Sequence, residues 1–240
     1  MARSGSRPNL TVAAYERLRA DVLACRLRPG QRLKIGELCA SLSFGLGAIR
    51  EALSRLTAEG LIVASPQRGF SVAPISRADL EDLTSVRIEV EQSCLRRAVA
   101  AGTLAWESRI VATLHELSQT PERVTEDEAR LNEDWVRVHA AFHMALVAAC
   151  DSPWRLRLRA QLYAQAERYR RLSVPLARTA RNLRDEHRVL AEAVLARDAD
   201  AGALLMAEHL QRTTIILTSE AELPDSAAGG WHPRSGADDT

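Results

Sequence analysis

Apolar residues recur at intervals of three and four along most of the chain, and this period predicts a mostly α-helical protein. Near the N-terminus the spacing predicts one helix from Thr11 to about Leu27, a shorter helix near Ile35–Leu42 and a third helix that ends near Gly60. A break at Pro29–Gly30 separates the first two helices. The pattern therefore predicts three short helices before residue 61.

The pattern changes after the third predicted helix. Two short apolar runs, Leu61–Ala64 and Phe70–Ala73, flank the turn-forming residues 65–69, and this arrangement predicts a two-stranded hairpin. Three helices followed by a hairpin are typical of a winged helix-turn-helix. We therefore expect a DNA-binding domain of this kind at residues 1–75.

Helical periodicity returns after the short linker Ala73–Pro74–Ile75. Ser76–Asp79 resembles a capping box, and it begins a helix that we expect to reach about Ala101. Further helices are predicted over residues 104–118, 126–150, 153–173, 178–197 and 199–219. The pattern predicts an all-helical domain at residues 76–221. The last segment, 222–240, is rich in Ala, Gly, Asp and Ser, and we expect a disordered tail there.

Composition supports this division. The chain has 240 residues, of which 46% are apolar, and this is enough for a folded core. Residues 1–75 carry 11 Lys and Arg against 5 Asp and Glu, a net charge of +6, whereas the rest carries 21 against 26, a net charge of −5. A basic segment joined to an acidic one is typical of a protein that binds double-stranded DNA through one domain, although chance variation in surface charge would give the same asymmetry.

The cysteines and the N-terminus suggest a cytoplasmic protein. The four cysteines (Cys25, Cys39, Cys94 and Cys150) include no C-x-x-C pair, so neither a disulfide framework nor a zinc knuckle is indicated. The N-terminal residues lack the apolar stretch of a signal peptide, and no segment approaches the 18 apolar residues of a membrane span. We therefore expect reduced thiols and no membrane partner.

Four histidines share a pattern that suggests a metal site. His139 and His143 are four residues apart, so they lie on one face of a helix beside its apolar stripe. His187 and His209 each lie on the apolar side of their own predicted helix. Neutral imidazoles suit a divalent ion such as Zn²⁺ or Ni²⁺. A buried histidine is more often a hydrogen-bonded core residue, so the pattern alone leaves both interpretations open.

Four motifs in the first 75 residues resemble the DNA-binding domain of GntR-type bacterial transcription regulators. They are Leu27–Leu33 (LRPGQRL), Ile49–Leu56 (IREALSRL), Glu59–Leu61 (EGL) and Gln67–Phe70 (QRGF). The resemblance implies that the third helix enters the major groove of an operator and that the hairpin tip reaches the adjacent minor groove. Arg50 then matches the recognition-helix arginine, and Arg68 with Gly69 matches the tip of the wing.

The start of the recognition helix departs from that family. It contains Gly45, Leu46, Gly47 and Ala48 where the family usually has polar or basic residues. Bare backbone N–H groups at Gly45 and Gly47 can still hold a phosphate. We therefore expect Arg50 to carry most of the base recognition through a bidentate contact with guanine, the alternative being a surface pair with Glu51 or Glu37.

The second half of the chain resembles the FCD effector domain of the FadR subfamily, and this resemblance implies an antiparallel all-helical bundle at residues 76–221. The motifs that carry the likeness are Val86–Glu91 (VRIEVE), His139–Leu146 (HAAFHMAL), Glu186–His187 and Ala207–Leu210 (AEHL). Members of that family commonly hold a divalent metal at the centre of the bundle with Asp or Asn and three histidines. Here His139 stands at the Asp/Asn position, so the site would carry one more positive charge than a site that contains Asp.

The same resemblance implies a small carboxylate effector bound on or near the metal. Arg87 matches an arginine that neutralises such anions in the family, and Arg168 offers a second cation. For Arg170 and Arg171 we favour surface pairs with Glu167 or its neighbours.

Together these features predict a homodimeric transcription regulator, not an enzyme, in which a repressor is released from its operator by a carboxylic acid. One alternative is a metal-dependent helical-bundle enzyme with a vestigial DNA-binding domain; the absence of H-E-x-x-H and of a nucleophile–base pair argues against it. The other alternative is a regulator whose metal site is purely structural.

Overall fold

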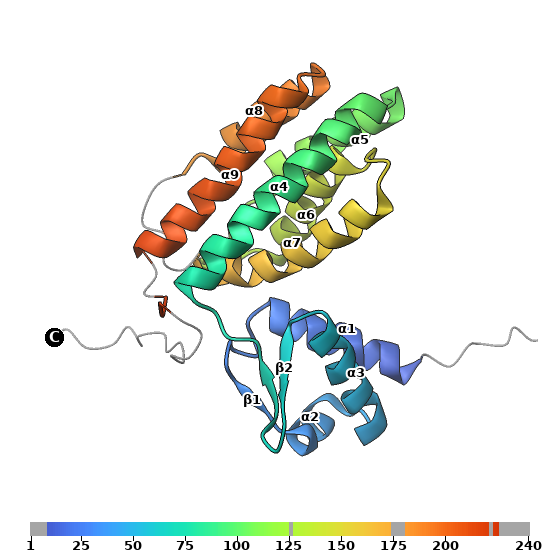
Figure 1. Cartoon of the computed structure of the whole chain (residues 1–240), viewed down its shortest axis with the longest axis vertical. Coiled ribbons are helices and arrows are strands. Elements are labelled where there is room, and N and C mark those ends of the chain that lie inside the picture. The colour runs from blue at the N-terminus through green and yellow to red at the C-terminus, as the bar shows by residue number, and fades with distance from the viewer. Residues whose placement is uncertain (1–8, 125–126, 174–180, 221–222, 226–240) are drawn as a thin grey trace, which may run out of the picture. The chain divides into compact units, whose positions relative to one another are not determined.

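The computed structural model describes residues 9–124, 127–173, 181–220 and 223–225 (Figure 1). The chain forms two compact units. The N-terminal unit comprises residues 1–77 with 223–240, and the C-terminal unit comprises residues 78–222. The fold is mostly helical, with a winged helix-turn-helix followed by a helical bundle, as the sequence predicted. Most of the predicted tail, 222–240, lies outside the described residues.

The N-terminal unit contains three helices and a small antiparallel sheet. The elements are α1 (Leu10–Leu23), β1 (Arg32–Leu33), α2 (Ile35–Leu42), α3 (Leu46–Ala58), β2 (Ile62–Ser65) and β3 (Gly69–Val72). The strands lie in the order β1-β3-β2. Strand β1 was not predicted from the sequence. It pairs with β3, with Arg32 opposite Ser71, so the predicted hairpin is part of a three-stranded sheet.

The ends of α1 differ from the prediction for local reasons. Asn9 caps the helix by accepting a hydrogen bond from the backbone N of Thr11 at 3.1 Å, so the helix begins before Thr11. It ends at Leu23 instead of about Leu27, and the chain turns at Cys25, whose φ is +55°. Gly60, with a φ of +72°, follows α3 in the left-handed conformation that suits glycine at a helix end.

The C-terminal unit is an antiparallel bundle of long helices with one short hairpin (Figure 1). The elements are α4 (Arg77–Ala101), α5 (Leu104–Gln119), β4 (Arg123–Val124), β5 (Asp127–Leu131), α6 (Glu133–Val147), α7 (Pro153–Ser173), α8 (Leu183–Leu195) and α9 (Ala199–Glu220). No helix among the described residues is long and apolar enough to cross a membrane.

Two helix starts in this unit were predicted wrongly. The helix expected from residue 126 begins at Glu133, because residues 127–131 pair with β4 and Asn132 then caps α6 by accepting a hydrogen bond from the N of Asp134 at 3.0 Å. The helix expected from residue 178 is seen from Leu183, behind its cap Asn182. Residues 178–180 lie outside the described part of the chain.

Candidate metal centre

The structure brings the four predicted histidines together at the centre of the C-terminal unit. His139 and His143 come from α6, His187 from α8 and His209 from α9. Each offers one ring nitrogen, and these four atoms lie within 4.8 Å of one another. All four side chains are buried, with His143 fully enclosed. The helical spacing places each imidazole on the inner face of its own helix, and the packing of three helices makes them meet.

The hydrogen bonds of these imidazoles leave ring nitrogens for a further ligand. Nδ1 of His209 lies 2.9 Å from Oε2 of Glu186, and Nδ1 of His139 lies 3.3 Å from the hydroxyl of Tyr163. Neither ring nitrogen of His143 has a hydrogen-bond partner among the described residues, and nor does Nε2 of His187. Buried polar atoms without partners are costly, and a metal ion would satisfy them. The donor set therefore fits a divalent cation.

The surroundings also keep the imidazoles in the form that binds metal. Burial lowers the pKa of His139, His143 and His187, and the neighbouring imidazoles lower it further. Burial lowers the pKa of His209 as well, although the hydrogen bond with Glu186 acts in the opposite direction. Neutral imidazole has a nitrogen lone pair free for coordination, whereas the protonated ring has none.

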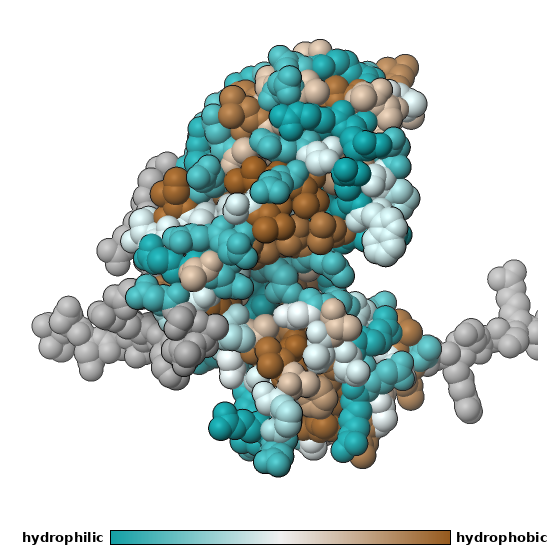
Figure 2. All heavy atoms as spheres, in the orientation of Figure 1, coloured by the Kyte–Doolittle hydropathy of each residue, from teal (hydrophilic) through white to brown (hydrophobic). Residues whose placement is uncertain are grey.

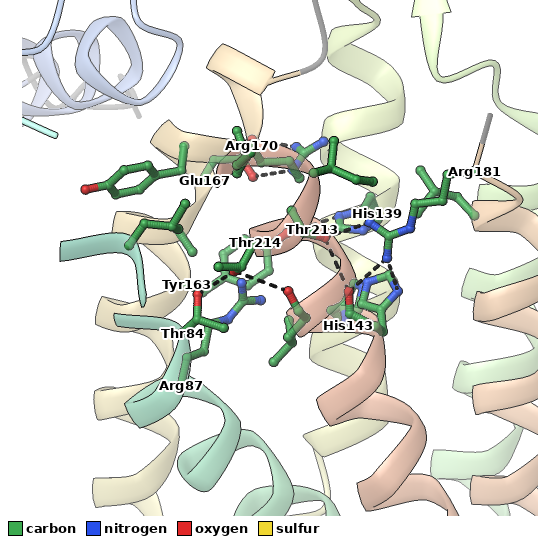
Figure 3. A pocket seen from close by; sticks show the side chains of 18 of the residues that line it. Thr84, Arg87, His139, His143, Tyr163, Glu167, Arg170, Arg181, Thr213 and Thr214 are labelled. Atoms are coloured by element: carbon green, nitrogen blue, oxygen red, sulfur yellow. Dashed lines mark hydrogen bonds and ion pairs between the residues drawn. The ribbon is translucent and has the colours of Figure 1, made fainter. Parts of the chain in front are cut away.

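A cavity of about 350 Å³ opens beside this cluster (Figure 3). His139, His143 and His209 form part of its wall. Its cationic side chains are Arg87, Arg123, Arg170 and Arg181, its carboxylates are Glu122 and Glu167, and its apolar wall includes Leu80, Leu183, Leu210 and Leu217. The wall therefore carries more cationic than anionic side chains, and its apolar part is suited to hydrocarbon.

Arg87 lies where an anion could reach it. Its guanidinium lies 5.0 Å from the centre of the Tyr163 ring, and its Nε lies 3.6 Å from Oε1 of Glu91, too far for a hydrogen bond. Glu91 is instead hydrogen-bonded by Arg159, at 2.8 Å. Burial lowers the pKa of Arg87. Two buried guanidinium groups thus share one carboxylate, and this leaves an excess positive charge in the wall.

The other predicted effector residue, Arg168, does not line the cavity. It is buried, and its Nη1 donates a hydrogen bond to Oε1 of Gln165 at 3.0 Å. Arg170 lines the cavity instead, bonded to Glu167, and Arg171 bridges Glu167 and Glu133. The helical spacing could have indicated that Arg170 faces the cavity and that Arg168 does not.

Tyr163, Glu167 and Arg170 are four and three residues apart, so they share a helix face that does not include Arg168. Arg181 was missed altogether. It lies outside any helix, just before the cap of α8, so helical periodicity gives no signal for it.

The predicted DNA-binding residues lie on the surface of the N-terminal unit. Gly45 is the N-cap of α3, and Gly47 and Arg50 are exposed in its first turns. The first backbone hydrogen bond of the helix runs from Ile49 N to Gly45 O, so the preceding amides are free to meet another group.

Arg68 and Gly69 are exposed at the turn between β2 and β3. Glu37, which could compete with DNA for Arg50, is paired with Lys34, whose Nζ lies 2.7 Å from Oε1 of Glu37.

Comparison with known proteins agrees with both halves of this structure. Residues 10–72 match the bacterial regulatory proteins of the gntR family, and residues 82–212 match the FCD domain. The HTH-type transcriptional regulator BphR of Paraburkholderia xenovorans is 40% identical over 209 residues, which cover 87% of this chain and 85% of that protein. The HTH-type transcriptional repressor GlaR of Escherichia coli is 36% identical over 200 residues, 82% of this chain and 90% of the relative.

A solved structure shows the same fold. E. coli McbR/YncC superposes with a TM-score of 0.71 at 22% identity, covering 88% of this chain and 98% of that one. Family matches over both units, together with relatives similar over most of their length, settle the assignment. The chain belongs to the GntR family of bacterial transcription regulators, and its C-terminal unit is an FCD domain.

Proposed function

We propose that this regulator is a repressor that binds its operator as a homodimer and is released when a small carboxylic acid enters a metal-centred cavity. The observation that carries the proposal is the set of four buried imidazoles within 4.8 Å of one another. The cluster borders a cavity that also contains Arg87. Residues 1–75 would bind DNA, and residues 76–221 would bind the metal and the effector.

The donor set favours Zn²⁺ or Ni²⁺. His139, His143, His187 and His209 would supply four nitrogen ligands, whereas Mg²⁺, Ca²⁺ and Mn²⁺ prefer oxygen. The bound ion would supply a Lewis-acidic site for a carboxylate oxygen. Because none of the four ligands is negatively charged, the ion would keep its full charge of two.

That charge defines the class of effector. The divalent ion and the wall in which Arg87 and Arg159 share Glu91 would together place excess positive charge in a buried space. Such charge is costly away from water unless an anion enters. A short dicarboxylate would answer this need, with one carboxylate at the metal and the other at Arg87.

Two surfaces support operator binding by a homodimer. The N-terminal unit carries the basic residues and the exposed first turn of α3. On the C-terminal unit, apolar residues gather on the surface in the region of α4 and α7 (Figure 2). Exposed apolar side chains of these two helices include Val86 of α4 and Leu158 of α7. An apolar area of this kind suits the self-complementary contact of a twofold dimer.

The test is operator binding in the presence of a panel of mono- and dicarboxylates. An effector alters operator affinity only as far as it favours one arrangement of the dimer, and typical couplings of about 1–3 kcal/mol correspond to a weakening of roughly 5- to 150-fold. Arg87→Ala should abolish this response and leave the metal content and effector-free operator binding intact. Arg96→Ala is the matched control, because Arg96 lies on the same helix but is exposed and paired with Asp200.

Each alternative has its own outcome. If no acid stabilises the protein against heat or changes operator binding, the metal site is structural and the sensor proposal is wrong. Consumption of the bound acid in the same samples would instead identify an enzyme.

A further inference from the structure

Glu186 connects two of the helices that supply the histidines. It precedes His187 in α8, and its partly buried carboxylate faces His209 of α9, with Oε2 2.9 Å from Nδ1 of the ring. Arg181 holds the same carboxylate by two hydrogen bonds, Nε to Oε1 at 2.9 Å and Nη2 to Oε2 at 2.6 Å. The carboxylate therefore has a fixed orientation.

Arg181 also fixes the backbone behind the ring. Its Nη2 donates to the carbonyl oxygen of His209 at 2.8 Å, and its Nη1 donates to the hydroxyl of Thr213 at 2.7 Å. Arg181 and Glu186 together hold His209 at both its main chain and its ring, and rotation of this imidazole would break the ring contact with Glu186.

The contact with Glu186 determines which nitrogen of His209 carries the proton. Both oxygens of the Glu186 carboxylate accept hydrogen bonds from the Arg181 guanidinium, and this ion pair favours the ionised carboxylate. An ionised carboxylate only accepts hydrogen bonds, so its 2.9 Å contact with His209 places the hydrogen on Nδ1. Nη2 of Arg181 also lies 3.3 Å from Nδ1, but its two hydrogens have closer acceptors in Oε2 of Glu186 and the carbonyl oxygen of His209. A neutral imidazole has one such hydrogen, and Nε2 therefore presents a lone pair.

The other candidate ligands have no equivalent constraint. His139 contacts the hydroxyl of Tyr163, which either donates or accepts, and His143 has no hydrogen bond at either nitrogen. Among the four clustered histidines, the contacts give a carboxylate partner to His209 alone. Carboxylate–histidine–metal arrangements orient ligands in this way in other metal sites.

We propose that Glu186, held by Arg181, is a positioning residue that fixes the tautomer and the orientation of His209 so that Nε2 binds the metal. The inference rests on the proposed metal site. It assigns to Glu186 a role that does not require contact with the ion.

The test measures Zn²⁺ affinity of the full-length protein by competition with a chromophoric chelator at neutral pH. Glu186→Ala should weaken Zn²⁺ binding about 10- to 100-fold, the usual loss for an outer partner of a metal ligand. Glu186→Gln should recover most of the affinity, because the amide oxygen can accept the same hydrogen bond. Glu192→Gln is the matched control, since Glu192 lies on the same helix and is paired with Arg188, but it is exposed and far along the helix from the cluster.

Two further measurements separate positioning from a general loss of structure. The absorption spectrum of the Co²⁺-loaded protein should change in Glu186→Ala and stay unchanged in Glu192→Gln. Nitrogen NMR shifts should show the Nδ1–H tautomer of His209 in the wild type. If the alanine variant melts below the assay temperature, Glu186→Leu, which fills the same space, replaces it.

The outcomes are distinguishable from failure of the proposed function. A wild-type protein that binds no Zn²⁺ overturns the metal site itself. Two outcomes would overturn the positioning role alone, provided that the wild type binds Zn²⁺. In one, Glu186→Ala binds Zn²⁺ as well as the wild type does. In the other, the Glu186 and Glu192 variants lose Zn²⁺ affinity to the same extent.

Discussion

The cores of the two units differ in how many polar side chains they contain. The buried cluster of the N-terminal unit consists of apolar side chains such as Leu18, Ile49, Leu53 and Leu56, and the buried polar side chains among its described residues are Asp21 and Ser76. The C-terminal unit also has an apolar cluster, but four histidines and the Arg159–Glu91 pair are buried with it. The difference follows from where each unit meets its ligand.

DNA is recognised on an outer surface, and the proposed DNA-binding residues Arg50 and Arg68 are both exposed, so neither has to leave water in the free protein. A small effector bound inside a bundle requires polar groups in the interior, and each of them must be compensated there. The buried pairs and the lowered pKa values of the histidines show this compensation. Polar groups concentrated in the core of one unit are thus a sign that its ligand binds inside.

The largest expected effect is that acid destabilises the C-terminal unit more than the N-terminal unit. In metal-free protein, burial lowers the pKa of the four histidines below the ordinary value near 6.5, so the unfolded chain binds protons that the folded bundle does not. The bundle should have its full stability above about pH 6.5. Below that it should lose about 1.4 kcal/mol per pH unit for each imidazole that remains neutral when folded.

Tryptophan fluorescence can follow this loss in urea titrations. Trp106, Trp135 and Trp154 lie in the C-terminal unit, and the described part of the N-terminal unit contains neither tryptophan nor histidine. His115→Ala, which removes an exposed imidazole, should leave the pH dependence unchanged. Equal stability at pH 7.5 and pH 5.5 would contradict the interpretation.

Removal of the metal should have the next largest effect. Purified protein should carry near-stoichiometric metal by elemental analysis, and the His143→Ala, His187→Ala double variant should lose it. An ion bound only by the folded state adds RT ln(1 + [L]/Kd), about 4.1 kcal/mol when free metal is 1,000 times Kd, so the variant should lose this stabilisation. His115→Ala again serves as the control, and full metal content in the double variant would overturn the ligand assignment.

The sequence was informative where local signals determine structure. Helix α7 spans Pro153–Ser173 as predicted, because Ser152–Pro153 is a strong local start signal. The histidine cluster followed from helical spacing and the family motifs. Strand β1 was missed because its two residues are defined only by pairing with β3. The start of α6 was misplaced because residues 127–131 pair with the neighbouring strand β4, which is too short to give a strand pattern of its own.

Less of the cavity than of the fold could be predicted from the sequence. Arg181 reaches the histidine cluster through contacts with Glu186 and Thr213, which come from two different helices. Such contacts depend on how α8 packs against α9, and no local pattern encodes them.

Arg50→Ala tests the proposed DNA-binding surface of the N-terminal unit. If Arg50 contacts a guanine, the variant should lose about 1–3 kcal/mol of preference for the operator over random DNA, whereas the steep dependence on salt that comes from phosphate contacts should remain. Arg55→Ala removes the same charge from the exposed C-terminal end of α3, and it should weaken binding to both DNAs alike. Gel shifts in which Arg50→Ala weakens binding to the operator and to random DNA equally would contradict base recognition by Arg50.

Gly47→Ala should produce the smallest change and separate folding from DNA binding. Gly47 has no positive φ, and a Cβ added there would meet nothing within 4 Å, so the fold itself gives no reason for glycine. Alanine at such a position should stabilise the N-terminal unit by about 0.4–1 kcal/mol. If the first turn of α3 lies against DNA, the added methyl group should also weaken operator binding. Hydrogen exchange of α3 measures the first effect and gel shifts the second. A variant that is more stable and binds its operator as well as the wild type would show that DNA does not approach this turn closely.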